Sequence, residues 1–265
     1  MANKFALTGY QIVNGCQTSN VLFESRDATN ISRIGVSVKL VHSSTEEVIN
    51  KTIKATNSQN AVKPEDLEAL TEFQKRLETY YRTFQKSSIA LYYERRSRQW
   101  SSTAVEKSRV ITIPVQIKAF ASMFLDVPHR VAGYYGTVRT NVADRIFRLE
   151  HKDLPYFVSG LAWYRLDLLF RNRSLDSTLR PWRWYLMMSL RYTVAGHEMP
   201  QLNSNKIEDY CKPLLDVLSD NAKTSSAVEN IVKLISSQGI APQSKDEFKT
   251  QSFRDRILTA LSNQQ

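Results

Sequence analysis

A short polar turn near the start of the chain has the residue types of a ligand site. Its residues are Asn14, Gly15, Cys16, Gln17 and Thr18. They follow residues 5–13, whose aromatic and β-branched side chains are typical of a strand. The Asn-Gly pair predicts a tight turn, and helical spacing begins after it. A helix N-terminus placed this way offers backbone N–H groups to an anion. The same turn also joins elements in proteins that bind nothing there, so both interpretations stay open.

A second polar loop follows the next predicted helix, which begins near residue 45. The loop consists of Asn57, Ser58, Gln59 and Asn60. If residues 5–56 fold as strand, helix, strand and helix, with the second strand over residues 34–41, both loops lie at one edge of a sheet. A phosphate or nucleotide is then the expected ligand. The alternative is that the second loop only caps the helices that it joins.

Aromatic and basic residues alternate between residues 92 and 100. The candidates for nucleic-acid contact are Tyr93, Arg95, Arg96 and Arg98. Arginine binds phosphate with two parallel hydrogen bonds, and aromatic faces accept stacked bases. The alternative is an edge strand with Tyr92 in the core and the arginines in water.

Patterns of known catalytic and metal sites are missing from the sequence. No histidine is positioned by its spacing to activate Cys16, and the two cysteines and four histidines form no zinc spacing. A P-loop, a Gly-x-Ser-x-Gly turn and the Asp…Glu-x-Lys pattern of many nucleases are likewise not found. We therefore expect no metal site and leave catalysis undecided.

The charge of the chain favours a polyanionic partner. The 265 residues carry a formal net charge of +10. From Lys75 to Trp100 seven Lys and Arg stand against two Glu, and from Arg139 to Arg191 ten stand against five acids. Two basic blocks suggest nucleic acid, although a solubilising surface explains them too. Two distant cysteines favour a reducing, cytoplasmic location, and no apolar run is long enough to cross a membrane.

Glycine and proline are sparse, which favours helices over many short strands. Short strands are predicted over residues 89–93 and 109–113, and long apolar helices over residues 154–170 and 182–194. The expected fold is α+β and predominantly helical, with a small N-terminal α/β unit packed on a larger helical C-terminal half. The expected domains are residues 1–113 and 114–265.

Three segments together resemble the abortive-infection phage-resistance (AIPR) proteins. They are residues 11–18 (Gln-Ile-Val-Asn-Gly-Cys-Gln-Thr), residues 55–60 (Ala-Thr-Asn-Ser-Gln-Asn) leading to Asp66-Leu67, and residues 92–96 (Tyr-Tyr-Glu-Arg-Arg). The resemblance implies a bacterial or mobile-element protein of phage defence. Members of that family usually carry a further N-terminal region, which favours the interpretation of the chain as a fragment. The alternative, in which helices of the C-terminal half cover the small N-terminal sheet, stays open.

A more distant likeness links residues 14–18 to the turn of ParB-like and sulfiredoxin-like proteins, which grips a nucleotide phosphate. Thr18 stands where those turns usually carry a basic residue, which favours binding over hydrolysis. We therefore expect the chain to be a phage-defence module that binds nucleic acid or a nucleotide. A nucleotide is the cofactor that we consider. The alternatives are an NTPase or nuclease, and a scaffold that regulates an effector domain outside this chain. The oligomeric state is left open.

Overall fold

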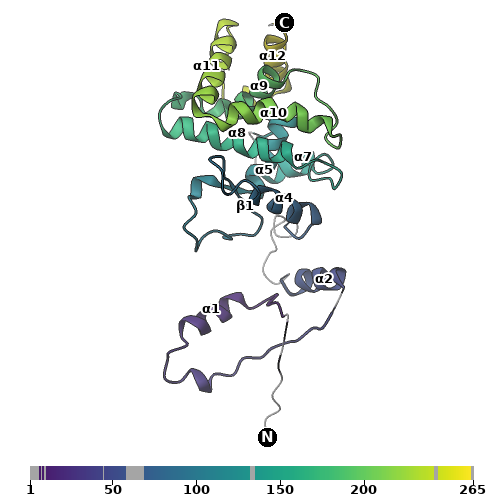
Figure 1. Cartoon of the computed structure of the whole chain (residues 1–265), viewed down its shortest axis with the longest axis vertical. Helices are drawn as coiled ribbons and strands as arrows, with labels where there is room; N and C mark the ends of the chain where they lie inside the picture. Colours follow the sequence, from purple (N-terminus) through teal and green to yellow (C-terminus); the bar gives the residue numbers. More distant parts are fainter. Residues whose placement is uncertain are drawn as a thin grey trace. The chain divides into compact units, whose positions relative to one another are not determined.

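The chain divides into two compact units, Met1–Leu70 and Thr71–Gln265 (Figure 1). The computed structural model describes residues 6, 8, 10–43, 45–57, 69–131, 135–241 and 244–263. These residues are mostly helical, with one two-stranded parallel sheet. The predicted class, α+β and predominantly helical, is confirmed. The domain boundary expected between residues 113 and 114 stays a prediction.

The described part of the first unit contains two α-helices and a short 3-10 helix, η1 (Ile31–Arg33). The α-helices are α1 (Cys16–Glu24) and α2 (Glu46–Asn57), both near their predicted places. Gly15 precedes α1 with a φ of 98°, in the left-handed region that glycine adopts without strain. The expected Asn-Gly turn before a helix is therefore present.

The strands predicted in the first unit are wrong for the residues that the structure describes. Residues 10–13 and 34–41 carry no strand, although Ile34, Val38 and Leu40 keep the apolar alternation. All three side chains are exposed. A strand exists only through hydrogen bonds to a neighbouring strand, and alternation in sequence does not supply that neighbour.

The sheet lies in the second unit, where strands were also predicted. Strand β1 (Tyr92–Glu94) pairs in parallel with β2 (Val110–Thr112), and Tyr93 lies opposite Ile111. Parallel strands cannot be joined by a tight hairpin, so the chain must return from the end of β1 to the start of β2. The connection at residues 95–109 makes this return, and α4 (Glu72–Arg82) packs against β1.

Helices build the rest of the second unit (Figure 1). Helix α5 (Ile113–Phe124) contacts both α8 (Leu154–Arg171) and α9 (Arg183–Ala195), and these three make the centre of the core. The remaining helices surround them: α6 (Pro128–Val131), α7 (Tyr135–Val142), α10 (Lys206–Ser219), α11 (Asn221–Ser237) and α12 (Gln251–Ser262). Within the described ranges, no helix combines the length and the apolar character that crossing a membrane requires.

Candidate nucleic-acid and ligand-binding residues

Tyr93 is a core residue at the centre of β1. Its side chain is only 1% exposed, and its ring centroid lies 5.2 Å from that of Tyr81. Its hydroxyl donates a hydrogen bond to the side-chain oxygen of Gln74 on α4. The neighbouring Tyr92 is half-buried. The sequence interpretation placed Tyr92 in the core, but it is Tyr93, the next residue along the strand, whose side chain faces the core.

Arg95 extends inward from the end of β1 to Glu78 on α4. Arg95 Nε lies 2.8 Å from Glu78 Oε2, and Arg82 and Gln99 each donate to Glu78 Oε1 at 2.7 Å. Burial alone raises the pKa of the Glu78 carboxyl, but the hydrogen bonds from Arg95, Arg82 and Gln99 outweigh it and lower that pKa below its usual value. This carboxylate is therefore ionised at neutral pH. It holds Arg95 and Gln99, the two ends of the turn, against α4.

The turn after Arg95 is held from both ends. The Gln99 side-chain oxygen accepts hydrogen bonds from the backbone N–H groups of Arg95 and Arg96 at 3.2 and 3.1 Å. Trp100 donates from Nε1 to the Tyr93 carbonyl at 3.1 Å, and its ring meets the ring of Tyr92 edge-on. These contacts fix the backbone of residues 95–100.

Arg96 and Arg98 point into solvent from this fixed turn. Both are exposed, and neither forms an ion pair with any acidic residue in the described part of the chain. Arg98 has a φ of 60°, a left-handed conformation that is uncommon for a residue with a long side chain. The structure thus separates the four predicted nucleic-acid residues into two buried ones, Tyr93 and Arg95, and two exposed ones.

The predicted ligand residues of the N-terminal unit lie on two segments. Asn14 and Gly15 precede α1, while Cys16, Gln17 and Thr18 form its first turn, and Asn57 is the last residue of α2. Gly15, the N-cap residue of α1, provides no side-chain hydrogen bond to the helix. Ser58, Gln59 and Asn60 lie outside the described residues. The sheet edge on which both loops were expected is not formed by the described residues of this unit.

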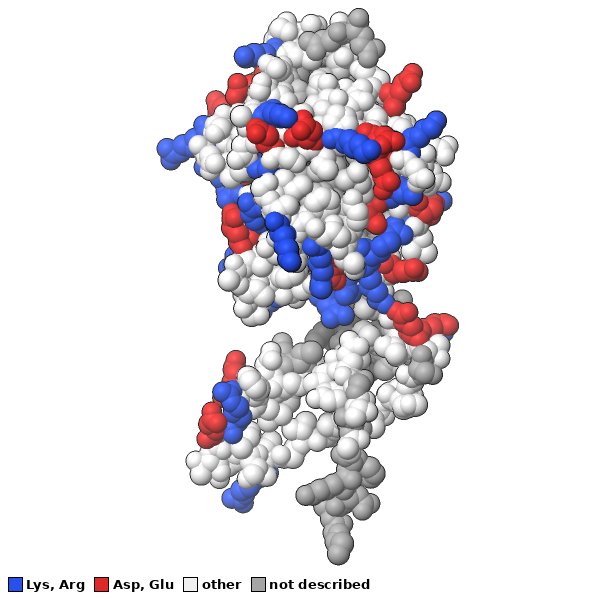
Figure 2. All heavy atoms as spheres, in the orientation of Figure 1, with Lys and Arg blue, Asp and Glu red and all other residues white. Residues whose placement is uncertain are grey.

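The excess positive charge belongs to the second unit alone. Residues 1–70 contain seven Lys and Arg and seven Asp and Glu, whereas residues 71–265 contain 29 and 19, a net charge of +10. Figure 2 shows Lys and Arg side chains gathered in the lower part of this unit on the face in view. The positive charge of this unit would therefore attract a polyanion.

Sequence reasoning missed Glu78 and Gln99, which hold the arginine turn in place. A signal for Glu78 was present, because it adjoins the apolar face formed by Phe73, Leu77 and Tyr81 on α4. A carboxylate at such a position needs a cationic partner when it is buried. Gln99 gave no comparable signal, since its contacts depend on the path of the turn.

The comparison of the sequence with protein families decides its membership. The profile of the AIPR protein family matches residues 3–246. The chain belongs to the AIPR family. This confirms the resemblance carried by the three short segments, and the family is associated with abortive-infection phage resistance. No curated protein and no solved structure matches the chain.

Proposed function

We propose that this AIPR-family chain binds nucleic acid through the basic surface of residues 71–265, with Arg96 and Arg98 as phosphate contacts. The observation that carries the proposal is the fixed turn that presents both arginines to solvent. They lie in the unit that holds the whole net charge of +10. Arg96 and Arg98 have no acidic partner to displace before they meet a phosphate, because the described residues offer them none.

The hydrogen bonds of Gln99 and Trp100 support the same proposal. A fixed backbone loses less conformational freedom when a ligand binds, so more of the contact energy remains as affinity. Arginine is suited to phosphate because its planar group presents two donors side by side. Arg95 contributes differently, since its ion pair with Glu78 supports the turn from inside.

The experiment is oligonucleotide binding by the double charge reversal Arg96→Glu and Arg98→Glu. We expect weaker binding to a single-stranded oligonucleotide and a smaller slope of log K against log salt. Each lost phosphate contact reduces that slope by about 0.7 for a single strand, so the double variant should lose about 1.4.

A second double variant, Lys233→Glu with Lys245→Glu, is the matched control. Both lysines are exposed and lie far along the chain from the turn, and the change in net charge is the same. Retained affinity and slope in this control, with loss in the turn variant, support contacts at the turn. An equal loss in both variants contradicts them and points to a diffuse effect of net charge.

A nucleotide site at Asn14–Thr18 is the second candidate. The observation in its favour is that α1 begins directly after Gly15, a left-handed glycine without a side chain, and the backbone N–H groups of a first helical turn are donors suited to an anion. A nucleotide at a hundred times its Kd should stabilise the fold by about 2.7 kcal/mol. A thermal-shift screen with wild type and Gln17→Ala tests this, and a shift of equal size in both proteins removes Gln17 from the site.

A further inference from the structure

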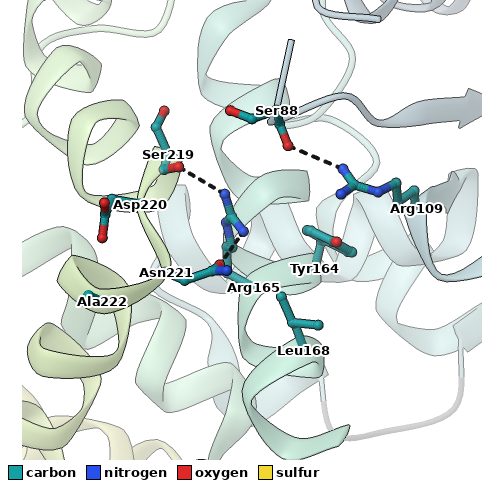
Figure 3. Close-up of a pocket in the computed structure, with 9 residues that line it drawn as sticks. All are labelled: Ser88, Arg109, Tyr164, Arg165, Leu168, Ser219, Asp220, Asn221 and Ala222. Atoms are coloured by element: carbon teal, nitrogen blue, oxygen red, sulfur yellow. Dashed lines mark hydrogen bonds between the residues drawn. The ribbon is translucent and has the colours of Figure 1, made fainter. Parts of the chain in front are cut away.

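A cavity in the second unit brings two arginines together away from the Arg96 turn. Its volume is about 480 Å³, and it is lined by Ser88, Arg109, Tyr164, Arg165 and the first residues of α11 (Figure 3). Residues that are far apart in the sequence thus line the same cavity. Its volume lies in the range of small-molecule sites.

Arg165 lines the cavity and is fixed there by hydrogen bonds. The residue is 5% exposed. Its Nε donates to the Leu218 carbonyl at 2.6 Å and its Nη2 to the Ser219 carbonyl at 3.0 Å, while Nη1 donates to the Asn221 side chain. These bonds occupy three of its five donor hydrogens and tie the guanidinium to the junction of α10 and α11.

Arg109 also lines the cavity. Its guanidinium lies over the ring of Tyr164 at 4.9 Å from the centroid, and its Nη1 donates to the Ala90 carbonyl at 2.9 Å. Its Nε pairs with Glu106 at 3.1 Å. No bond of Nη2 to another described residue is found, which leaves that end of the group available.

The electrostatics of the cavity favour an anion. Burial lowers the pKa of Arg165, and the charge of Arg109 lowers it further, while Tyr164 and Asp220 act in the opposite direction. Two acids lie beside these cations: Glu106 pairs with Arg109, and the Asp220 carboxylate lines the cavity and accepts the Lys223 backbone N–H at the start of α11. The guanidinium groups of Arg109 and Arg165 thus line one cavity, and the positive charge of Arg109 acts on Arg165.

We propose that this cavity binds the phosphate group of a nucleotide, held between Arg109 and Arg165 beside the first residues of α11. The bound phosphate offsets the repulsion between the two guanidinium groups and accepts the donor hydrogens that they do not use. The proposal does not rest on the proposed nucleic-acid surface, since it uses different residues of the same unit.

The test uses Ala222→Glu in the full chain. Ala222 is exposed at the rim of the cavity in the first turn of α11, where a carboxylate favours the helix. The fold should therefore persist while the new charge repels phosphate. We expect AMP binding, measured by calorimetry, to weaken about tenfold or more. Arg109→Gln should weaken AMP binding in the same direction.

Asn230→Glu is the matched control, because Asn230 is exposed on the same helix and does not line the cavity. It should bind AMP like wild type. If inorganic phosphate competes with AMP, the cavity recognises the phosphate group. If AMP also binds more tightly than phosphate, the rest of the cavity contacts the nucleoside. No AMP or phosphate binding by wild type, or equal AMP binding by Ala222→Glu, overturns the proposal.

The outcomes separate the two sites. The double variant Arg96→Glu and Arg98→Glu should keep AMP binding, whereas Ala222→Glu should keep oligonucleotide binding. Loss of oligonucleotide binding alone concerns the turn, and loss of AMP binding alone concerns the cavity.

Discussion

Arg95 Nε and Glu78 Oε2 lie 2.8 Å apart, and both side chains are about nine-tenths buried, at 10% and 9% exposure. This ion pair joins the end of β1 to α4. It gives Arg95 a structural task, although its position beside Arg96 in the sequence suggests the same surface role for both. The two neighbours should therefore respond differently to the same substitution.

Replacing Arg95 with alanine should lower the free energy of unfolding by about 3 kcal/mol, because it leaves the Glu78 carboxylate buried without its main partner. Arg82 and Gln99 still donate to Glu78, which keeps the loss at the lower end for a broken buried pair. Urea unfolding of the purified chain measures the change. Arg96→Ala is the comparison and should stay within about 0.5 kcal/mol of wild type. Equal effects of the two substitutions would contradict this assignment.

Arg98→Asn should separate stability from binding. Arg98 has a φ of 60°, and asparagine adopts the left-handed region more readily than arginine does. We expect the free energy of unfolding to rise by up to about 1 kcal/mol while oligonucleotide affinity falls through loss of the charge. In the control Arg96→Asn, which starts from a backbone without positive φ, affinity should fall with no gain in stability. A loss of stability in Arg98→Asn would show that the arginine side chain itself supports the turn.

The long helices of the second unit were predictable from sequence. Residues 154–170 and 182–194 were expected as helices, and the structure has Leu154–Arg171 and Arg183–Ala195. Their apolar side chains repeat over the 18 residues of α8 and the 13 residues of α9, and Pro155 suits the first turn of α8. Such signals are local, so the sequence alone is sufficient to show them.

The strands and the arginine cluster depended on information that is not local. Residues 34–41 alternate like a strand, yet a strand also needs a partner, which no pattern within those eight residues can show. Residues 92–94 form a strand because Val110–Thr112 lies beside them. In the same way, the burial of Arg95 follows from the position of Glu78, 17 residues earlier, across a packed helix.

Gly160 on α8 should not tolerate alanine. A Cβ at this position would collide with the Tyr81 hydroxyl, which is held by its 2.6 Å hydrogen bond to the Gln116 side-chain oxygen. Overpacking of this kind costs about 2 kcal/mol in the free energy of unfolding, even after the better helix propensity of alanine is counted. Denaturant unfolding of Gly160→Ala measures the cost.

The same substitution in a Tyr81→Phe background tests the cause. Removing the hydroxyl frees the space that the new methyl group needs, so Gly160→Ala should cost less there than in wild type. Tyr81→Phe has a cost of its own, because it leaves the buried Gln116 oxygen without this donor. An equal cost of Gly160→Ala in both backgrounds would mean that Tyr81 is not the obstacle.

His151 should make the fold less stable as the pH falls below about 6.5. Burial lowers the pKa of its imidazole, Glu150 opposes the shift, and Arg148 and Arg76 add to it. The Tyr156 hydroxyl accepts the Phe147 backbone N–H at 2.8 Å and lies 2.9 Å from His151 Nδ1. The tyrosine proton is thus free to point at a neutral imidazole, and protonation of Nδ1 would remove that acceptor.

The direction of the pH effect follows from proton binding. A histidine whose folded pKa is lowered binds fewer protons in the folded state than in the unfolded state, so its contribution to stability is full above pH 6.5 and is lost as the pH falls through the folded pKa. The expected slope is at most about 1.4 kcal/mol per pH unit for one proton. His129, whose pKa burial also lowers, adds to the slope in the same direction. Urea unfolding between pH 5 and 7.5 should therefore show a smaller slope in His151→Gln than in wild type, and an unchanged slope would exclude His151 as a source.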